Sequence, residues 1–341
     1  MPHMQTKKEK KPIKTSLPIQ NHFIGKLKEV MPQGIGLAEE IADMLDVSID
    51  SAYRRIRGET ELTIEEVFKL AKKHGISVDE IFSNESGAVT FTYTKLTDSV
   101  NNFEKYLNGI LGRLIALNKF EARKIYYVAE EIPMFYSFFS KKLTEFKLFY
   151  WQRSVLNVSE YQQQKFEYGF VPKKLTDIAH QCFTEYLSIP SVEIWTAETV
   201  LTGLRQIKFY FDSGIVKQEQ ALELLAEYRS MIDLVKTNAE NGRKNISDKN
   251  ETYQMYNSEV VLGTNCIYVL MGDSRFSNIS FNSMNSLTSN NPEFCEETEH
   301  WIRNLEKKST LISGVSEKQR YQFFSSMYKS IDAVVEKIRA S

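Results

Sequence analysis

The spacing of hydrophobic residues predicts a chain that is mainly α-helical. Between Asn21 and Phe82, apolar residues recur every three or four positions in short runs that turn-forming residues separate. This is the pattern of amphipathic helices that each bury one face. Capping signals, such as Thr63 followed by Glu66, mark where helices begin. We therefore predict a small domain of five short helices over residues 21–83.

Longer stripes of apolar and aromatic residues follow at the same helical spacing. They predict helices near 100–114, 120–131, 133–156, 172–188, 191–212 and 217–241. Pro133, Pro172 and Pro190 stand where helices would begin, a position that tolerates proline. Residues 259–282 differ, because β-branched and aromatic residues flank Gly272-Asp273 there, which predicts a β-hairpin. The expected fold class is mainly α, with a small inserted β-hairpin in the larger helical domain.

Shifts in composition divide the chain into four parts. Residues 5–20 combine five lysines with two prolines, which is typical of a flexible basic segment. Such a segment either keeps the protein in solution or contacts phosphates, and both interpretations stay open. His3-Met4 has the character of a cloning remnant. The predicted parts are a basic flexible arm at 1–20, the five-helix domain at 21–83, a linker at 84–99 and an α-helical dimerisation or effector domain at 100–341.

The stretch from Gly36 to Gly58 carries the strongest functional signal. Ala42 is small enough for two helices to cross closely, and Asp46, four positions later, tolerates the left-handed backbone of a tight turn. Ser48 then suits a helix N-cap, and Ala52 suits the inner face of the next helix. These features resemble the helix-turn-helix of the phage-repressor and Cro-like (XRE-type) bacterial regulators. The resemblance implies that the five-helix domain at 21–83 is a helix-turn-helix DNA-binding domain. That family usually has glycine at the position of Asp46.

The resemblance implies a cytoplasmic transcriptional regulator that binds double-stranded DNA through a recognition helix beginning at Ser48. It places some side chains at base edges and others at phosphates. The first group is Ile49, Asp50, Ser51 and Arg54; the second is Tyr53, Arg55 and Arg57, with a phosphate also expected at the backbone amides of Leu37 and Ala38.

The rotation of this helix about its axis stays open at the sequence level. The family usually has an apolar residue at the position of Arg55, whereas here Ile56 takes the inward role. A competing interpretation is a basic helix face that forms only surface salt bridges. Acidic side chains outnumber basic ones over residues 21–82, which favours that interpretation, but the arginines cluster on the second helix of the motif.

Charge and cysteine content limit the function classes. The net charge is −1, so the whole molecule is no polyanion binder and any DNA-binding surface must be a local patch. Cys182, Cys266 and Cys295 lie far apart, which argues against disulfide bonds and fits a reducing cytoplasm. No apolar run approaches the roughly 20 residues of a membrane-spanning helix, so no membrane partner is expected.

No catalytic or metal site emerges. Gly34-Ile35-Gly36 lacks the third glycine of a dinucleotide loop, and the pairs Ser326/Lys329 and Glu296/His300 lack further partners. We therefore predict neither enzymatic activity nor a cofactor or metal. The aromatic cluster from Phe135 to Trp151 is explained best as ordinary core, with a pocket or a dimer surface as alternatives.

The predicted function is a sequence-specific regulator that binds DNA as a homodimer. One recognition helix contacts few base pairs, and two half-sites supply affinity. The C-terminal domain would dimerise, sense an effector (a small molecule or a peptide), or do both. Two alternatives are a protein–protein adaptor that keeps the helix-turn-helix without DNA contact, and an enzyme that the helix-turn-helix anchors.

Overall fold

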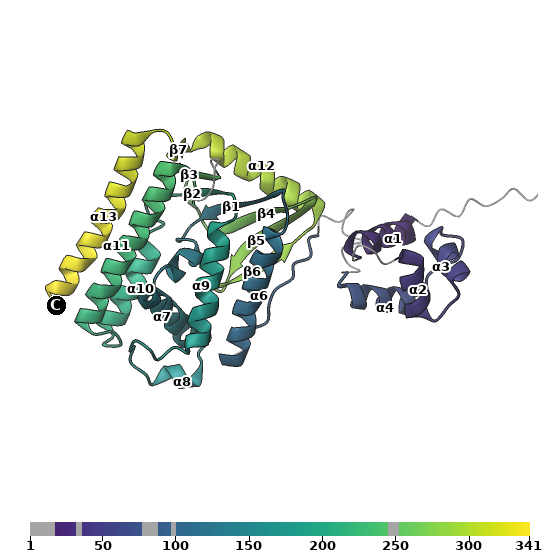
Figure 1. The fold of residues 1–341 in the computed structure, drawn as a ribbon, viewed down its shortest axis with the longest axis horizontal. Helices are drawn as coiled ribbons and strands as arrows, with labels where there is room; N and C mark the ends of the chain where they lie inside the picture. Colours follow the sequence, from purple (N-terminus) through teal and green to yellow (C-terminus); the bar gives the residue numbers. More distant parts are fainter. Residues whose placement is uncertain (1–17, 32–35, 77–87, 97–99, 245–251) are drawn as a thin grey trace, which may run out of the picture. The chain divides into compact units, whose positions relative to one another are not determined.

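The computed structural model describes residues 18–31, 36–76, 88–96, 100–244 and 252–341. The chain divides into two compact units, Met1–Thr90 and Phe91–Ser341, and each is described by itself (Figure 1).

The first unit is helical. Four helices, α1 (Pro18–Val30), α2 (Leu37–Leu45), α3 (Ile49–Ile56) and α4 (Ile64–His74), confirm four of the five predicted ones. The fifth, expected from Ser77 to Phe82, lies outside the described residues, as do residues 1–17 of the predicted arm. Their core consists of Phe23, Ile24, Leu27, Ala38, Ile41, Ala42, Ala52, Leu70 and Ala71.

The second unit is built on a mixed seven-stranded sheet with the order β6-β5-β4-β1-β2-β3-β7. Strands β1, β2 and β3 are parallel, while β4, β5 and β6 extend the sheet on one side in antiparallel fashion and β7 pairs antiparallel with β3. Their bounds are β1 (Arg123–Ala129), β2 (Ser191–Trp195), β3 (Tyr253–Asn257), β4 (Cys266–Met271), β5 (Ser274–Phe281), β6 (Asn285–Ser289) and β7 (Thr310–Leu311).

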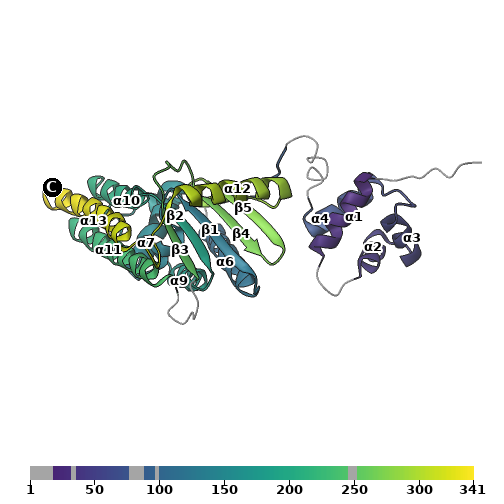
Figure 2. The same ribbon diagram turned by 90° about the horizontal axis from the view of Figure 1, so that it is seen from above.

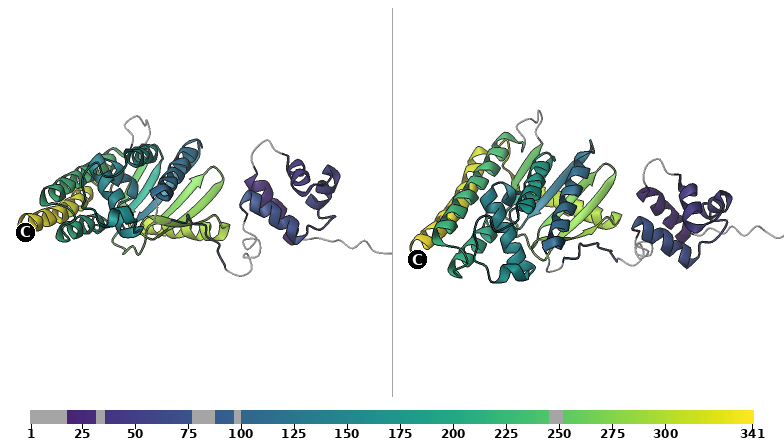
Figure 3. Two further views of the ribbon diagram at one scale, coloured as in Figure 1. Left: turned by 90° about the horizontal axis from the view of Figure 1, so that it is seen from below. Right: turned by 60° about the horizontal axis from the view of Figure 1, so that its bottom comes forward.

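Helices cover both faces of this sheet (Figure 2). On one face α12 packs through Cys295, Ile302 and Leu305. The opposite face carries the larger core, to which α6, α9 and α11 contribute, and α13 lies beside α11 (Figure 3). The helices are α6 (Val100–Asn118), α7 (Lys141–Tyr150), α8 (Ser159–Gln162), α9 (Lys173–Leu187), α10 (Leu201–Asp212), α11 (Gln218–Asn241), α12 (Pro292–Lys308) and α13 (Glu317–Arg339), with a 3₁₀ turn η2 (Met134–Phe138) and a π turn η3 (Trp151–Val155).

The prediction of a mainly α fold with an inserted hairpin is wrong for this unit. Strands β1 and β2 fall in stretches predicted as helices, because both of their faces are buried: Tyr126 and Val192 face α12, while Tyr127 and Trp195 join the larger core. A strand buried on both sides is nearly all apolar, and such a run has no period that separates it from a buried helix. The predicted hairpin exists as β4–β5 but forms part of the seven-stranded sheet.

Of the three predictions from proline positions, two are confirmed and one is wrong. Pro133 and Pro172 each stand directly before a helix, whereas Pro190 precedes strand β2.

The three cysteines are buried and free. In the described part of the chain, no helix combines the length and apolar character that crossing a membrane requires. The aromatic cluster is core, with these side chains buried: Phe135, Tyr136, Phe138, Phe146, Phe149 and Trp151.

Candidate nucleic-acid interface

The turn between α2 and α3 has the geometry that the sequence predicts. Asp46 has φ 54° and ψ 51°, the left-handed conformation that ends α2. The amide of Val47 then donates to the carbonyl oxygen of Ala42 at 3.1 Å. The Ser48 hydroxyl accepts a hydrogen bond from the Ser51 amide at 3.2 Å and caps α3. Because this cap fixes where α3 begins, the first turn of the candidate recognition helix is well defined.

One side of α3 is open to solvent. Ala52 is fully buried, and Ile56 packs against the core of the unit. The exposed side chains lie one, four, five and eight positions after the first of them, as expected for a single helical face. They are Ile49, Asp50, Tyr53, Arg54 and Arg57. This arrangement determines the rotation of the helix, which the sequence left open, and directs Arg54 and Arg57 outward.

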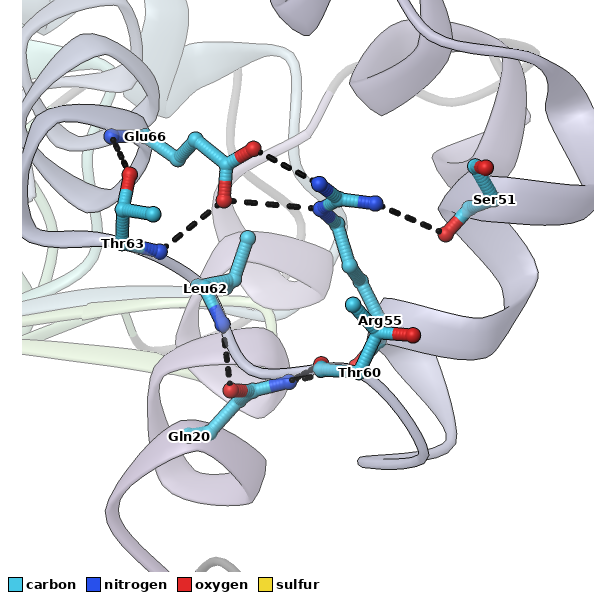
Figure 4. A network of polar contacts seen from close by, with 7 residues as sticks. All are labelled: Gln20, Ser51, Arg55, Thr60, Leu62, Thr63 and Glu66. Carbon is cyan, nitrogen blue, oxygen red and sulfur yellow. Dashed lines mark hydrogen bonds and ion pairs between the residues drawn. The ribbon is translucent and has the colours of Figure 1, made fainter.

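Arg55 points to the other side of α3 and joins it to α4 (Figure 4). Its guanidinium donates to both carboxylate oxygens of Glu66, at 2.8 and 3.4 Å, and to the carbonyl oxygen of Ser51 at 3.4 Å. Only 15% of the Arg55 side chain is exposed. The phosphate contact that the sequence suggests for Arg55 stays a prediction, and the structure gives this residue a place inside the unit.

Glu66 serves two helices at once. It accepts the Thr63 amide at 2.9 Å while its own amide donates to the Thr63 hydroxyl, which forms the predicted capping box of α4. Burial opposes ionisation of this carboxyl, but the hydrogen bonds from Arg55 and Thr63 outweigh it and lower its pKa. An ionised Glu66 therefore holds Arg55 and with it the orientation of α3.

Gln20 of α1 fixes the loop that follows α3, a role the sequence analysis missed. Its amide nitrogen donates to the carbonyl oxygens of Arg55 and Thr60 at 2.7 and 2.9 Å, and its amide oxygen accepts the Leu62 amide at 2.8 Å (Figure 4). The sequence assigned Gln20 to the basic arm. The residues around Gln20 in the sequence carry no capping or periodic signal, so only the tertiary fold reveals its hydrogen bonds to this loop.

Glu59 lies beside the two outward arginines. Its carboxylate accepts two hydrogen bonds from Arg57, at 2.7 and 3.0 Å, and lies 4.0 Å from the Arg54 guanidinium. The hydrogen bond from Arg57 lowers the pKa of Glu59, and Glu59 in turn raises the pKa of Arg57. A phosphate at this end of α3 would replace Glu59 as the partner of Arg57, because both are anions that pair with the same guanidinium.

The N-terminus of α2 is less open than the sequence suggests. Gly36 forms its N-cap without a side-chain hydrogen bond, Leu37 is half-buried and Ala38 is buried. The Glu39 carboxylate lies so close to Gly36 that a Cβ atom there would collide with it. Any phosphate bound by the Leu37 and Ala38 amides would meet this negative charge, and that contact stays a prediction.

Among the described residues, no three or more His, Cys, Asp or Glu side chains are grouped as they would be around a metal ion.

Residues 26–107 match the BetR domain, a helix-turn-helix-like DNA-binding domain family found in transcriptional regulators. No curated protein and no solved structure matches the chain. The match covers α2, α3 and α4 and continues into α6. It indicates a DNA-binding regulatory domain in this part of the chain.

Proposed function

We propose that this chain is a sequence-specific transcriptional regulator that inserts α3 into the major groove of double-stranded DNA. The observation that supports this best is the exposed face of α3, which presents Arg54 and Arg57 while Arg55 and Gln20 hold the helix from behind. A helix held rigidly by its neighbours can place side chains at base edges with the precision that sequence recognition needs.

Four of the five exposed side chains have a distinct role in this proposal. Arg54 reads a guanine through two hydrogen bonds, and Ile49 contacts a thymine methyl group. Tyr53 and Arg57 bind phosphates, and Arg57 exchanges Glu59 for a phosphate oxygen. Arg55 acts as a positioning residue, because Glu66 already occupies its guanidinium.

The active species in this proposal is a homodimer, since one short helix reads too few base pairs for adequate affinity. The second unit contributes dimerisation, effector sensing or both, and no catalytic step is part of its role. The adaptor alternative is less favoured because Arg54 and Arg57 are open to solvent within their unit.

Operator selection followed by two substitutions tests the proposal. An operator is selected from random duplexes with the full chain, and binding is then measured by fluorescence anisotropy over a salt titration. Arg54→Ala should weaken operator binding by about 1–3 kcal/mol and relax the preference at one position. Arg57→Ala should weaken binding to all duplexes and reduce the salt slope by about one.

Arg339→Ala serves as the matched control, since it removes an exposed arginine from α13 of the other unit. It should leave both affinity and salt slope unchanged. Selection of no duplex even in dilute buffer would refute DNA recognition and support the adaptor. Unaltered operator binding by Arg54→Ala would instead show that α3 is not the reading helix.

A further inference from the structure

A cavity of about 340 Å³ lies in the second unit between α6 and the sheet. Ile110 and Leu114 of α6 form one wall. The opposite wall is a row of side chains from three neighbouring strands: Ile125 of β1 lies opposite Val269 of β4, which lies opposite Phe276 of β5. The volume is in the range of sites that hold drug-sized molecules.

The sheet face under α6 is not closed as a core would be. Ile267, Val269 and Met271 alternate along β4 toward this cavity and are only half-buried, although β4 has strands on both sides. Half-covered apolar side chains in the interior of a sheet leave hydrophobic contact unmade. A ligand that filled the cavity would supply it.

The cavity changes character along its length. Beyond the apolar row, amide and hydroxyl side chains line it, among them Asn265, Asn278 and Thr288. Asn278 is held in place, because its amide donates to the Ile267 carbonyl oxygen at 3.0 Å and accepts the Thr288 hydroxyl at 2.7 Å. The carboxylate that lines this end, Glu131, has Lys147 at 3.9 Å as a counterion.

We propose that this cavity binds a small uncharged molecule with an apolar body and one or two hydrogen-bonding groups. The apolar body lies against Val269 and Phe276, and the polar group reaches the amides of the far end. Two charged residues line the cavity: Glu131, which is paired with Lys147, and Arg113, which lies on the exposed side of α6. Because the rest of the lining is predominantly apolar, a charged ligand would lose its hydration there, so it is disfavoured.

Some residues that line the cavity also bond to the first residues of the second unit. Thr288 and Thr92 exchange two backbone hydrogen bonds of 2.8 Å, and the Asn285 amide donates to the Thr94 carbonyl oxygen. The Tyr106 hydroxyl donates to the Met284 carbonyl oxygen. The residues that line the cavity therefore also hold residues 92–94, which follow the first unit along the chain. Ligand control of operator affinity through this segment is part of the inference and rests on the proposed function.

Binding of N-phenyl-1-naphthylamine to the full chain tests the site. This probe is uncharged, has one N–H donor and becomes fluorescent in apolar surroundings. We expect saturable binding of one probe per chain. Ile110→Trp fills the cavity from α6 and should weaken binding at least tenfold, whereas Ile115→Trp, on the exposed face of the same helix, should leave it unchanged.

Near-ultraviolet circular dichroism shows whether Ile110→Trp folds. If it does not fold, a second variant tests the site instead. Asn278→Leu keeps the approximate volume but removes the polar anchor, and it too should weaken probe binding. Equal probe affinity in Ile110→Trp, or in Asn278→Leu, and the parent chain overturns the site. If the probe binds but operator affinity does not change, only the regulatory link is overturned. If the chain binds its operator but not the probe, the ligand site is overturned and the proposed function stays intact.

Discussion

Two carboxylates, one in each unit, organise their surroundings in opposite ways. Glu66 of the first unit has 17% of its side chain exposed and is paired with the cation Arg55. Glu193 of the second unit lies on β2, is fully buried and accepts hydrogen bonds from three tyrosines. The first arrangement orients a helix that we propose to work at the surface, while the second joins elements inside the core.

The difference also appears in the acidity of the two groups. Burial raises the pKa of Glu193, even though Lys244 and the hydroxyls of Tyr136, Tyr186 and Tyr253 favour its ionised form. The pKa of Glu66 is lowered, because its hydrogen bonds outweigh a smaller degree of burial. Complete burial thus opposes the charge of Glu193 more than its partners favour it, whereas the Glu66–Arg55 pair, which keeps 15–17% of its side chains exposed, favours the charged form.

The largest effect is expected from Glu193→Ala. The substitution leaves the hydroxyls of Tyr136, Tyr186 and Tyr253, now 2.6–3.1 Å from a carboxylate oxygen, without an acceptor in the core. We expect the second unit to lose about 3–5 kcal/mol of unfolding free energy. Urea denaturation of the full chain, followed by near-ultraviolet circular dichroism, measures it.

Glu193→Gln is the matched control, since it retains one carbonyl oxygen as an acceptor and should cost clearly less. A loss below about 1 kcal/mol for Glu193→Ala would mean that the three tyrosines find other partners, and the contrast between the units would fail.

A smaller effect is expected from Arg55→Ala in the first unit. It removes the charge-assisted bonds to Glu66 and should cost about 1–2 kcal/mol. Hydrogen exchange of the α3 and α4 amides measures this loss in the full chain. Arg54→Ala is the control, because it removes the same kind of side chain and the same charge from an exposed position. It should change the free energy measured by this exchange by less than about 0.5 kcal/mol. Equal protection in both variants would show that Arg55 does not orient α3.

The smallest effect is the response to pH, which should have opposite signs in the two units. The lowered pKa of Glu66 gives a contribution that is present above an ordinary pKa of about 4.3 and is lost as the pH falls below it. The raised pKa of Glu193 gives a contribution that is present below about 4.3 and is lost as the pH rises through the folded-state pKa.

Hydrogen exchange of the amides of each unit, recorded at several pH values between 3 and 8, measures how the unfolding free energy of that unit responds. Glu66→Gln should flatten the acid side of the first unit's profile, and Glu193→Gln should flatten the neutral side of the second unit's. If a substitution leaves the pH profile of its unit unchanged, other groups cause the pH response of that unit.

The sequence predicted the first unit well because its signals are local. Asp46, Ser48 and the Thr63–Glu66 pair each act within a few residues, so turn and cap chemistry alone locate α2, α3 and α4. The rotation of α3 depended on Glu66, which lies eleven positions from Arg55, and no local signal determines that choice.

The second unit could not be predicted in the same way. Its parallel strands pair with strands more than 60 residues away along the chain, as where Tyr127 of β1 lies opposite Glu193 of β2. Strands covered on both faces lose the alternation that marks a strand, and their aromatic residues also suit a buried helix. Only β4 and β5, which a tight turn at Gly272 joins, were recognisable from the sequence.

The pairing of Thr92 with Thr288 has a consequence for the solubility of the second unit. Strand β6 is the last strand on its side of the sheet, and an unprotected outer strand readily recruits a strand from another molecule. Thr92 occupies both the donor and the acceptor of Thr288. A fragment that started at Leu96 would lose this protection and expose the strand to self-association, so the boundary for separate expression belongs at Phe91 or earlier.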